Sequence, residues 1–170
     1  MEKINVRSLV VSAILAALVM VSIFFIKIPM IGQGYVHIAD SFILLSALLG
    51  PFYGFLVGGI GTMLADLLAG YAIYAPWSLM VHGLQAVLMA LLIGKVADLS
   101  WVKFFIGGLV ISFLTVVLGY ALVEYILSGG QMALALATIP INFLQILVGT
   151  AVGTVLYEPI KKLLALNKAK

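Results

Sequence analysis

Cysteine is absent from this chain of 170 residues, and charged side chains make up only 9% of it. Without cysteine there is no disulfide framework, no thiolate metal site and no cysteine nucleophile. Soluble domains carry about 25% charged residues, whereas here 65% of the residues are hydrophobic and the mean hydropathy is +1.29. A small soluble fold could not bury so much apolar surface. The composition therefore excludes a cytosolic enzyme, a secreted disulfide scaffold and a nucleic-acid-binding protein, and it predicts an integral membrane protein.

Long apolar segments, separated by glycine, proline or polar residues, predict an all-α bundle of six transmembrane helices in one domain, residues 1–170. Helices are expected because a backbone in lipid must satisfy its own hydrogen bonds. The expected spans are residues 9–28, 36–49, 52–69, 77–96, 103–127 and 132–157, followed by a basic tail over 158–170. The second span is too short to cross a bilayer without tilt or help from its neighbours.

The distribution of basic residues predicts the orientation of these spans. With six spans, one side of the membrane collects eight of the nine basic residues, and only Lys27 lies on the other side. The eight are Lys3, Arg7, Lys95, Lys103, Lys161, Lys162, Lys168 and Lys170. Lys and Arg near span ends mark the cytoplasmic side, so both termini are expected in the cytoplasm. The net charge of +3 is then a topology signal, with a contribution to contact with anionic lipid.

Polar side chains within the spans recur at helical spacing, which places each group on one face of its helix. The groups are Thr62 with Asp66, Ser78 with His82 and Gln85, Tyr120 with Glu124, and Thr138 with Asn142 and Gln145. All lie in the outer halves of their spans, while the inner halves are mostly small and aliphatic. Polar groups in a membrane mark functional positions. The pattern predicts a pocket open to the outside and closed toward the cytoplasm.

Aromatic residues near the outer ends favour a flat heteroaromatic ligand held below them. The expected substrate-binding residues are Tyr35, Tyr74, Trp77, His82, Gln85, Tyr120, Glu124, Asn142 and Gln145. Each also has a structural interpretation: tyrosine and tryptophan form interfacial belts, and polar side chains join helices. Asp40 and Asp66 equally fit capping or pairing between helices. We expect His37 and Lys27 to be solvated.

No cofactor or metal is expected. The two histidines lie on different segments without ligand-like spacing. Nor is there a P-loop, since Gly94-Lys95 is followed by Val96. Any ATP that drives transport must therefore be hydrolysed by another chain, and the chain is not expected to be an enzyme.

Small residues at four-residue spacing allow close approach of helices. The pairs Gly54/Gly58 and Gly149/Gly153 fit packing within the bundle. The pair Ala13 and Ala17, on the first span, could present a smooth face to a partner protein.

Several short motifs between residues 34 and 95 resemble those of the substrate-binding S components of energy-coupling factor (ECF) transporters, which import vitamins into prokaryotes. The motifs are YVHIAD at 35–40, LLGPFYG at 48–54, GGIG at 58–61, ADLL at 65–68, GY at 70–71 and YAP at 74–76. Outside these motifs the similarity is mainly in hydropathy and number of spans.

The resemblance implies a six-helix bundle in the cell membrane of a prokaryote, with a vitamin held near the outer face under the first loop. It also implies partners: a transmembrane coupling subunit, which Ala13 and Ala17 would contact, and two ATPase subunits that drive toppling of the loaded protein. The sequence looks most like members assigned to hydroxymethylpyrimidine or pyridoxine, with riboflavin-type members next. Glu124, if ionised and close to Tyr120 and Trp77, would instead suit a cationic ring such as thiamine.

Two hypotheses of other classes remain at this point. In one, the polar stripes only join helices in a structural or regulatory membrane protein. In the other, Asp40 and Asp66 form the dyad of an intramembrane enzyme, although nothing in the sequence fixes their separation.

Overall fold

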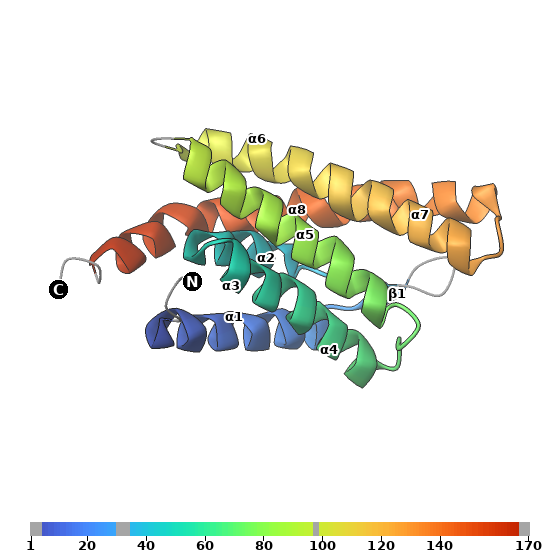
Figure 1. The fold of residues 1–170 in the computed structure, drawn as a ribbon. Coiled ribbons are helices and arrows are strands. Elements are labelled where there is room, and N and C mark those ends of the chain that lie inside the picture. The colour runs from blue at the N-terminus through green and yellow to red at the C-terminus, as the bar shows by residue number, and fades with distance from the viewer. Residues whose placement is uncertain (1–4, 30–34, 97–98, 167–170) are drawn as a thin grey trace.

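A computed structural model describes residues 5–29, 35–96 and 99–166, and these are mostly helical (Figure 1). The α-helices are α1 (Val6–Phe25), α2 (Asp40–Ser46), α3 (Pro51–Phe55), α4 (Gly61–Ala69), α5 (Ala75–Lys95), α6 (Trp101–Ser112), α7 (Leu118–Leu127) and α8 (Met132–Leu166). A 3₁₀ turn, η1 (Ala47–Leu49), extends α2, and single π-helical turns, η2 (Leu56–Ile60) and η3 (Phe113–Val117), join α3 to α4 and α6 to α7. Strands β1 (Ile28–Pro29) and β2 (Tyr35–Val36) pair antiparallel.

Five of the resulting helical rods are long and apolar enough to cross a membrane by length and composition: 6–25, 51–69, 75–95, 101–127 and 132–164. The sixth apolar segment, Asp40–Leu49, is much shorter. Ten residues of helix rise about 15 Å, half of a hydrocarbon core of about 30 Å. The structure therefore supports five long helices and one short one.

Three expected helices differ from the structure by three residues or more. The first, expected over 9–28, is Val6–Phe25, and Ile28 lies in β1. The second helix begins at Asp40 rather than at residue 36, because Tyr35 and Val36 are paired in the hairpin. The last helix continues to Leu166 through Pro159, although a tail was expected from residue 158. Contacts around Tyr157 hold this part in place: its ring stacks on Phe104 with centroids 4.3 Å apart, and its hydroxyl donates to the carbonyl of Leu99 at 3.0 Å.

Glycines in the π-helical turn η2 bring the α3–α4 rod directly against α5. A Cβ on Gly59 would lie 2.8 Å from the carbonyl oxygen of Leu79, and one on Gly58 would overlap the carbonyl oxygen of His82. No side chain fits between the two helices at this level. Small residues allow this close packing in a membrane, and it fixes the position of the α5 face that carries Ser78 and His82.

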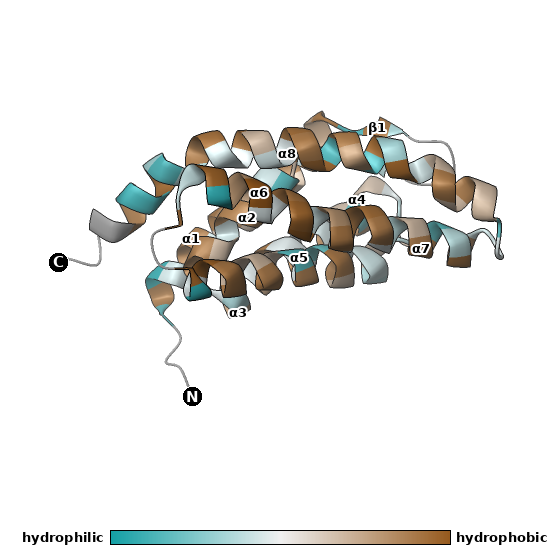
Figure 2. Cartoon of the chain, turned by 90° about the horizontal axis from the view of Figure 1, so that it is seen from above, coloured by the Kyte–Doolittle hydropathy of each residue, from teal (hydrophilic) through white to brown (hydrophobic). Residues whose placement is uncertain are grey.

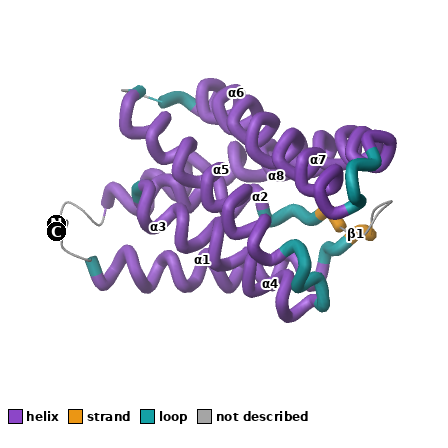
Figure 3. The backbone as a smooth tube through the Cα atoms, turned by 45° about the vertical axis from the view of Figure 1, so that its right-hand side comes forward, coloured by secondary structure: helices purple, strands orange, loops and turns teal. Residues whose placement is uncertain are grey.

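The two ends of the bundle differ in character. At one end lie the first turn of α1, the α5–α6 connection and the last turns of α8; at the other lie the β-hairpin and the α4–α5 and α7–α8 connections (Figures 1 and 3). The first end is filled by a buried apolar cluster that includes Leu44, Leu45, Met89, Phe104 and Tyr157. Hydrophobic residues cover most of the helix length, whereas the C-terminal turns of α8 are hydrophilic (Figure 2). The bundle is thus closed by apolar side chains at the end where α8 stops.

Candidate ligand pocket

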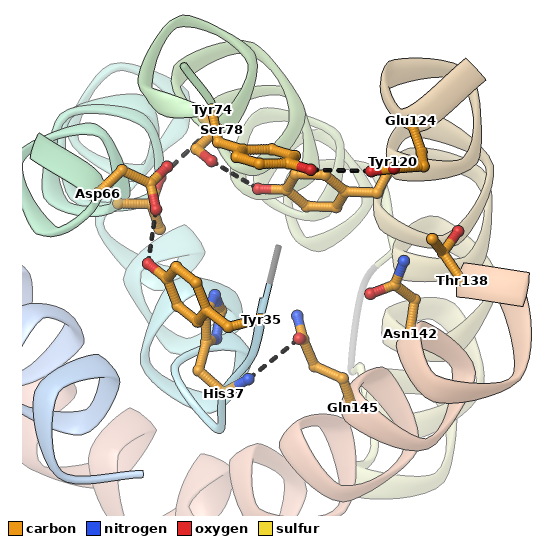
Figure 4. A pocket seen from close by; sticks show the side chains of 11 residues that line it. Tyr35, His37, Asp66, Tyr74, Ser78, Tyr120, Glu124, Thr138, Asn142 and Gln145 are labelled. Carbon is orange, nitrogen blue, oxygen red and sulfur yellow. Dashed lines mark hydrogen bonds between the residues drawn. The ribbon is translucent and has the colours of Figure 1, made fainter. Parts of the chain in front are cut away.

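At the hairpin end, polar side chains from the hairpin, α4, α5, α7 and α8 surround a cavity with about 470 Å³ of empty space, its open mouth included (Figure 4). The lining residues are Tyr35, His37, Thr62, Asp66, Tyr74, Ser78, Tyr120, Glu124, Thr138, Asn142 and Gln145. Every one of them carries a hydrogen-bonding group. Such a concentration of polar groups inside an apolar bundle is typical of a binding site.

The hairpin forms one wall through Tyr35. Its hydroxyl donates to Asp66 Oδ1 at 2.5 Å, and its ring packs against Tyr71 with centroids 4.5 Å apart. Lys27 Nζ lies over both rings, 5.7 Å and 5.0 Å from their centroids. Burial, and then the neighbouring Asp66, raise the pKa of the Tyr35 phenol above its ordinary value. The phenol therefore stays protonated and continues to donate to Asp66.

Hydrogen bonds of side-chain hydroxyls connect α5 to α7, and a hydroxyl of α4 lies near the α5 backbone. Tyr74 donates to Glu124 Oε2 at 2.8 Å, and the hydroxyls of Ser78 and Tyr120 lie 2.6 Å apart. Thr62 on α4 donates to the carbonyl oxygen of Gly58 in its own rod at 2.7 Å, and its Oγ1 also lies 3.2 Å from the carbonyl oxygen of Ser78. These bonds pair the i, i+4 stripe of α7 with that of α5, so that Glu124 and Tyr120 face the cavity rather than lipid.

The wall formed by α8 carries a side-chain donor that is not satisfied. Asn142 is 2% exposed, its amide points into the cavity (Figure 4), and its Nδ2 has no hydrogen-bond partner among the described residues. Thr138, one turn earlier, donates to the carbonyl of Ala135 at 2.8 Å. Leaving a buried donor unpaired costs about 1–3 kcal/mol. The Nδ2 group is therefore available to an acceptor on a ligand.

Below these walls, the floor is built around Asp40. Gln145 donates through Nε2 to Asp40 Oδ2 at 2.8 Å and accepts the backbone N–H of His37 on Oε1 at 3.1 Å. Gln85 donates to Asp40 Oδ1 at 2.8 Å. The imidazole of His37, in the loop before α2, accepts the Ala39 N–H on Nδ1 at 3.2 Å. Burial lowers the pKa of His37 to about 4, so the ring is neutral and carries its proton on Nε2.

Two glycines of α8 allow this floor to form. A Cβ on Gly149 would lie 2.6 Å from Asp40 Cβ, and one on Gly153 would lie 3.3 Å from the carbonyl oxygen of Ser41. The start of α2 can therefore approach α8 closely enough for Asp40 and Gln145 to bond.

Six of the nine residues expected from the sequence line the cavity: Tyr35, Tyr74, Tyr120, Glu124, Asn142 and Gln145. His82 and Gln85 are completely buried behind the floor. Trp77 is half-buried and does not line the cavity. The first loop falls on residues 30–34, outside the described residues. Ala13 and Ala17 are exposed on α1.

Five lining residues were not among those expected. Ser78 and Thr138 share helical stripes with expected residues, and Thr62 and Asp66 form a separate stripe; all four belong to the stripes that predict the pocket, although they were not among the expected substrate-binding residues. His37 was expected to be solvated, and this is wrong: it is 7% exposed because the hairpin folds it against α8. No local sequence signal predicts that contact.

Comparison with known proteins identifies the family. Residues 3–162 match the family described as ECF-type riboflavin transporter, S component. The chain is 30% identical over 170 residues to the thiamine precursor transporter HmpT of Lactococcus lactis subsp. cremoris (strain MG1363), covering 98% of this chain and 95% of that protein. It is also 33% identical over 119 residues, 69% of this chain and 78% of the relative, to an uncharacterized protein encoded in the gap 3′ region of Pyrococcus woesei. The chain therefore belongs to the family of ECF-type transporter S components and is a multi-pass membrane protein.

Proposed function

We propose that the protein captures a small vitamin or vitamin precursor from outside the cell in the cavity at the hairpin end, and delivers it as the substrate-binding subunit of an ECF-type importer. The observation that carries this proposal is the cavity itself, lined by hydrogen-bonding side chains from five parts of the chain above an apolar core. A continuous pore would need polar lining throughout its length. The arrangement supports a closed-bottomed binding site.

Hydroxymethylpyrimidine is the favoured ligand, with pyridoxine next. The pyrimidine is a thiamine precursor, and the L. lactis relative is named a thiamine precursor transporter. Its chemistry also suits the lining: an amino group can donate to Glu124, and a ring nitrogen can accept from the unpaired Asn142 Nδ2. Riboflavin, named in the family description, and thiamine are the alternative ligands.

The residues expected from the sequence take different roles in this proposal. The rings of Tyr35, Tyr74 and Tyr120 enclose the ligand ring, with Trp77 at the outer edge. Glu124, Asn142 and Gln145 supply its hydrogen bonds. Gln85 supports the site from behind the floor, and His82 beside it is equally buried.

For the topology we propose six membrane segments in one domain, residues 1–170, with both termini in the cytoplasm. The short second segment along the chain, Asp40–Leu49, packs against α1, α5 and α8 and does not need to span the bilayer alone. The excess of basic residues at the end opposite the hairpin supports this orientation. The cavity then opens to the outside.

Delivery would depend on other chains. We infer that a transmembrane coupling subunit docks on the exposed face of α1 around Ala13 and Ala17, where small residues permit close helix contact. Two ATPase subunits would supply the energy, and the loaded protein would topple in the membrane to release its ligand.

Mass spectrometry of small molecules released from the gently purified protein tests the proposal. Hydroxymethylpyrimidine, pyridoxine, riboflavin and thiamine are then titrated individually by calorimetry. We expect one of them to be retained and to bind with submicromolar affinity. No binding of any B vitamin or precursor at tens of micromolar would refute a vitamin-capture function.

The second candidate function is that of a structural or regulatory membrane protein. The many hydrogen bonds between helices favour it, for example Tyr74 to Glu124 and Gln145 to Asp40. It predicts that Asn142→Ala and His82→Ala both lower thermal stability and that no small molecule restores it.

A further inference from the structure

Asp40, itself completely buried, lies at the centre of a network of hydrogen bonds below the cavity. Each of its carboxyl oxygens accepts an amide N–H at 2.8 Å, Oδ1 from Gln85 and Oδ2 from Gln145. Neither histidine bonds to it directly, since His37 Nδ1 and His82 Nδ1 both lie 3.8 Å away. Both oxygens of Asp40 therefore act as acceptors in this arrangement, and this fixes the direction of the bonds around it.

The direction is passed on through Gln85 to His82. Gln85 uses Nε2 to donate to Asp40 and, at 2.8 Å, to Ser112 Oγ. Its Oε1 therefore faces His82 Nδ1, 2.9 Å away, and an amide oxygen can only accept. His82 must carry a proton on Nδ1. In the neutral ring, Nε2 is then an acceptor.

This acceptor has no partner among the described residues, although His82 is completely buried. Its ring lies against two residues that line the cavity, with centroids 5.4 Å from His37 and 5.7 Å from Tyr120. Ser78, one helical turn earlier, also lines the cavity. A buried acceptor without a partner calls for a ligand or a water molecule to complete it.

We propose that Asp40 is a positioning residue that sets the hydrogen-bonding polarity at the base of the pocket: through Gln85 it holds His82 in the Nδ1–H form, so that His82 Nε2 accepts an N–H or O–H donor of the ligand. The contact between His82 Nε2 and the ligand rests on the proposed function, whereas the direction of the hydrogen bonds around Asp40 does not. Asp40 itself need not touch the ligand.

Asp40→Asn is the decisive change, because asparagine keeps the shape but replaces one acceptor with a donor. If the new amide faced Gln145, that glutamine would have to turn its own N–H groups toward the His37 backbone N–H, which cannot become an acceptor. If it faces Gln85, the conflict is relieved. Gln85 then turns over, its Oε1 accepts from residue 40, its Nε2 donates to His82 Nδ1, and the His82 proton moves to Nε2.

Imidazole ¹⁵N NMR of the full chain measures this directly, because the protein contains only two histidines. In the wild type we expect His82 to be protonated on Nδ1 and His37 on Nε2. Asp40→Asn should move the His82 proton to Nε2 and leave His37 unchanged. The matched control is Ser112→Ala, which removes a hydrogen bond of the same Gln85 amide but leaves Asp40 in place; it should keep His82 protonated on Nδ1.

The ligand is tested with hydroxymethylpyrimidine, or with whichever vitamin the wild type binds. Its addition should shift the His82 Nε2 resonance. Asp40→Asn should weaken ligand binding about tenfold or more, because His82 Nε2 would change from an acceptor into a donor and would then face the donor of the ligand. Ser112→Ala should change the affinity less than threefold.

Each result has a definite meaning. Protonation of His82 on Nε2 in the wild type would overturn the inference even if Asp40→Asn does not fold. So would an unchanged proton position in that variant. If the proton moves but the ligand neither shifts Nε2 nor loses affinity, a water molecule alone completes His82 and the ligand contact is refuted. If no vitamin binds the wild type, the proposed function fails, while the NMR result still decides the role of Asp40 in directing the bonds.

Discussion

Replacing Asn142 with alanine is expected to weaken ligand binding while leaving the unliganded fold almost as stable as before. The reason is the unusual state of its side chain, which is buried although its Nδ2 bonds to none of the described residues. Removing it leaves no protein group newly unpaired. The free energy of unfolding should therefore fall by less than about 1 kcal/mol.

Gln145, one turn further along α8, is the matched comparison. It donates to Asp40 and accepts from the His37 backbone, both at hydrogen-bonding distance. Gln145→Ala leaves both of these buried groups without a partner. Since each costs about 1–3 kcal/mol unless water reaches it, we expect a loss of stability of at least about 1–2 kcal/mol.

For the ligand, the loss of one buried hydrogen bond to Asn142 should cost about 1–3 kcal/mol, or about 5- to 150-fold in affinity. Calorimetric titration with hydroxymethylpyrimidine measures this loss, and thermal unfolding in detergent without ligand measures the stability of both variants. The reasoning fails if Asn142→Ala destabilises the empty protein as much as Gln145→Ala does. It fails equally if Asn142→Ala binds the ligand like the wild type.

Three further predictions concern packing, docking and charge. Gly149→Ala should lower the free energy of unfolding by about 1–3 kcal/mol, because its Cβ would lie 2.6 Å from Asp40 Cβ. Gly94→Ala, whose Cβ would meet open space on α5, should raise that free energy by up to about 1 kcal/mol. Equal thermal unfolding of the two variants would contradict this prediction. Ala17→Trp should reduce vitamin uptake and co-purification with the coupling subunit without changing ligand affinity, so normal uptake would show that α1 is not the docking face. Glu124→Gln should weaken thiamine binding more than hydroxymethylpyrimidine binding in paired titrations, because only thiamine carries a fixed positive charge; an equal loss would exclude a charge contact.

Long apolar runs made the helices predictable, since their lengths and their glycine and proline boundaries are local properties. The exceptions come from tertiary contacts. Residues 158–166 are polar enough to suggest a tail, but stacking of Tyr157 on Phe104 and its bond to Leu99 hold the helix together beyond Pro159. The start of the second helix moved to Asp40 because the preceding residues pair with β1, and a pairing of two residues leaves almost no pattern in a sequence.

In the site, helical spacing predicted which faces are polar, and the structure brings four such stripes around one cavity. Spacing cannot say how deep along its helix each residue lies. Ser78 and His82 share a face of α5, yet Ser78 lines the cavity while His82 does not, and the ring of His82 lies 5.4 Å from that of His37. Depth depends on how close α2 and α5 come to their neighbours, and this is set by backbone contacts at Gly58 and Gly149.

The way the polar groups are paired gives a further argument about the ligand. Most lining groups already bond to one another, as Tyr35 does to Asp66 and Tyr74 to Glu124, so they shape the pocket more than they select its content. The unpaired atoms near the cavity select: among the described residues they are a donor on Asn142, an acceptor oxygen (Oδ2) on Asp66 and, behind the floor, the Nε2 of His82. A site with buried unpaired groups discriminates strongly against analogues that cannot complete them. A ligand with a ring-nitrogen acceptor and an adjacent donor completes both kinds of group. An aminopyrimidine supplies an amino group as this donor. Pyridoxine has no amino group and supplies a hydroxyl instead. A hydroxyl is also a donor, so both proposed ligands meet this pattern, and the unpaired atoms select for a ring acceptor with a neighbouring donor rather than for one of the two.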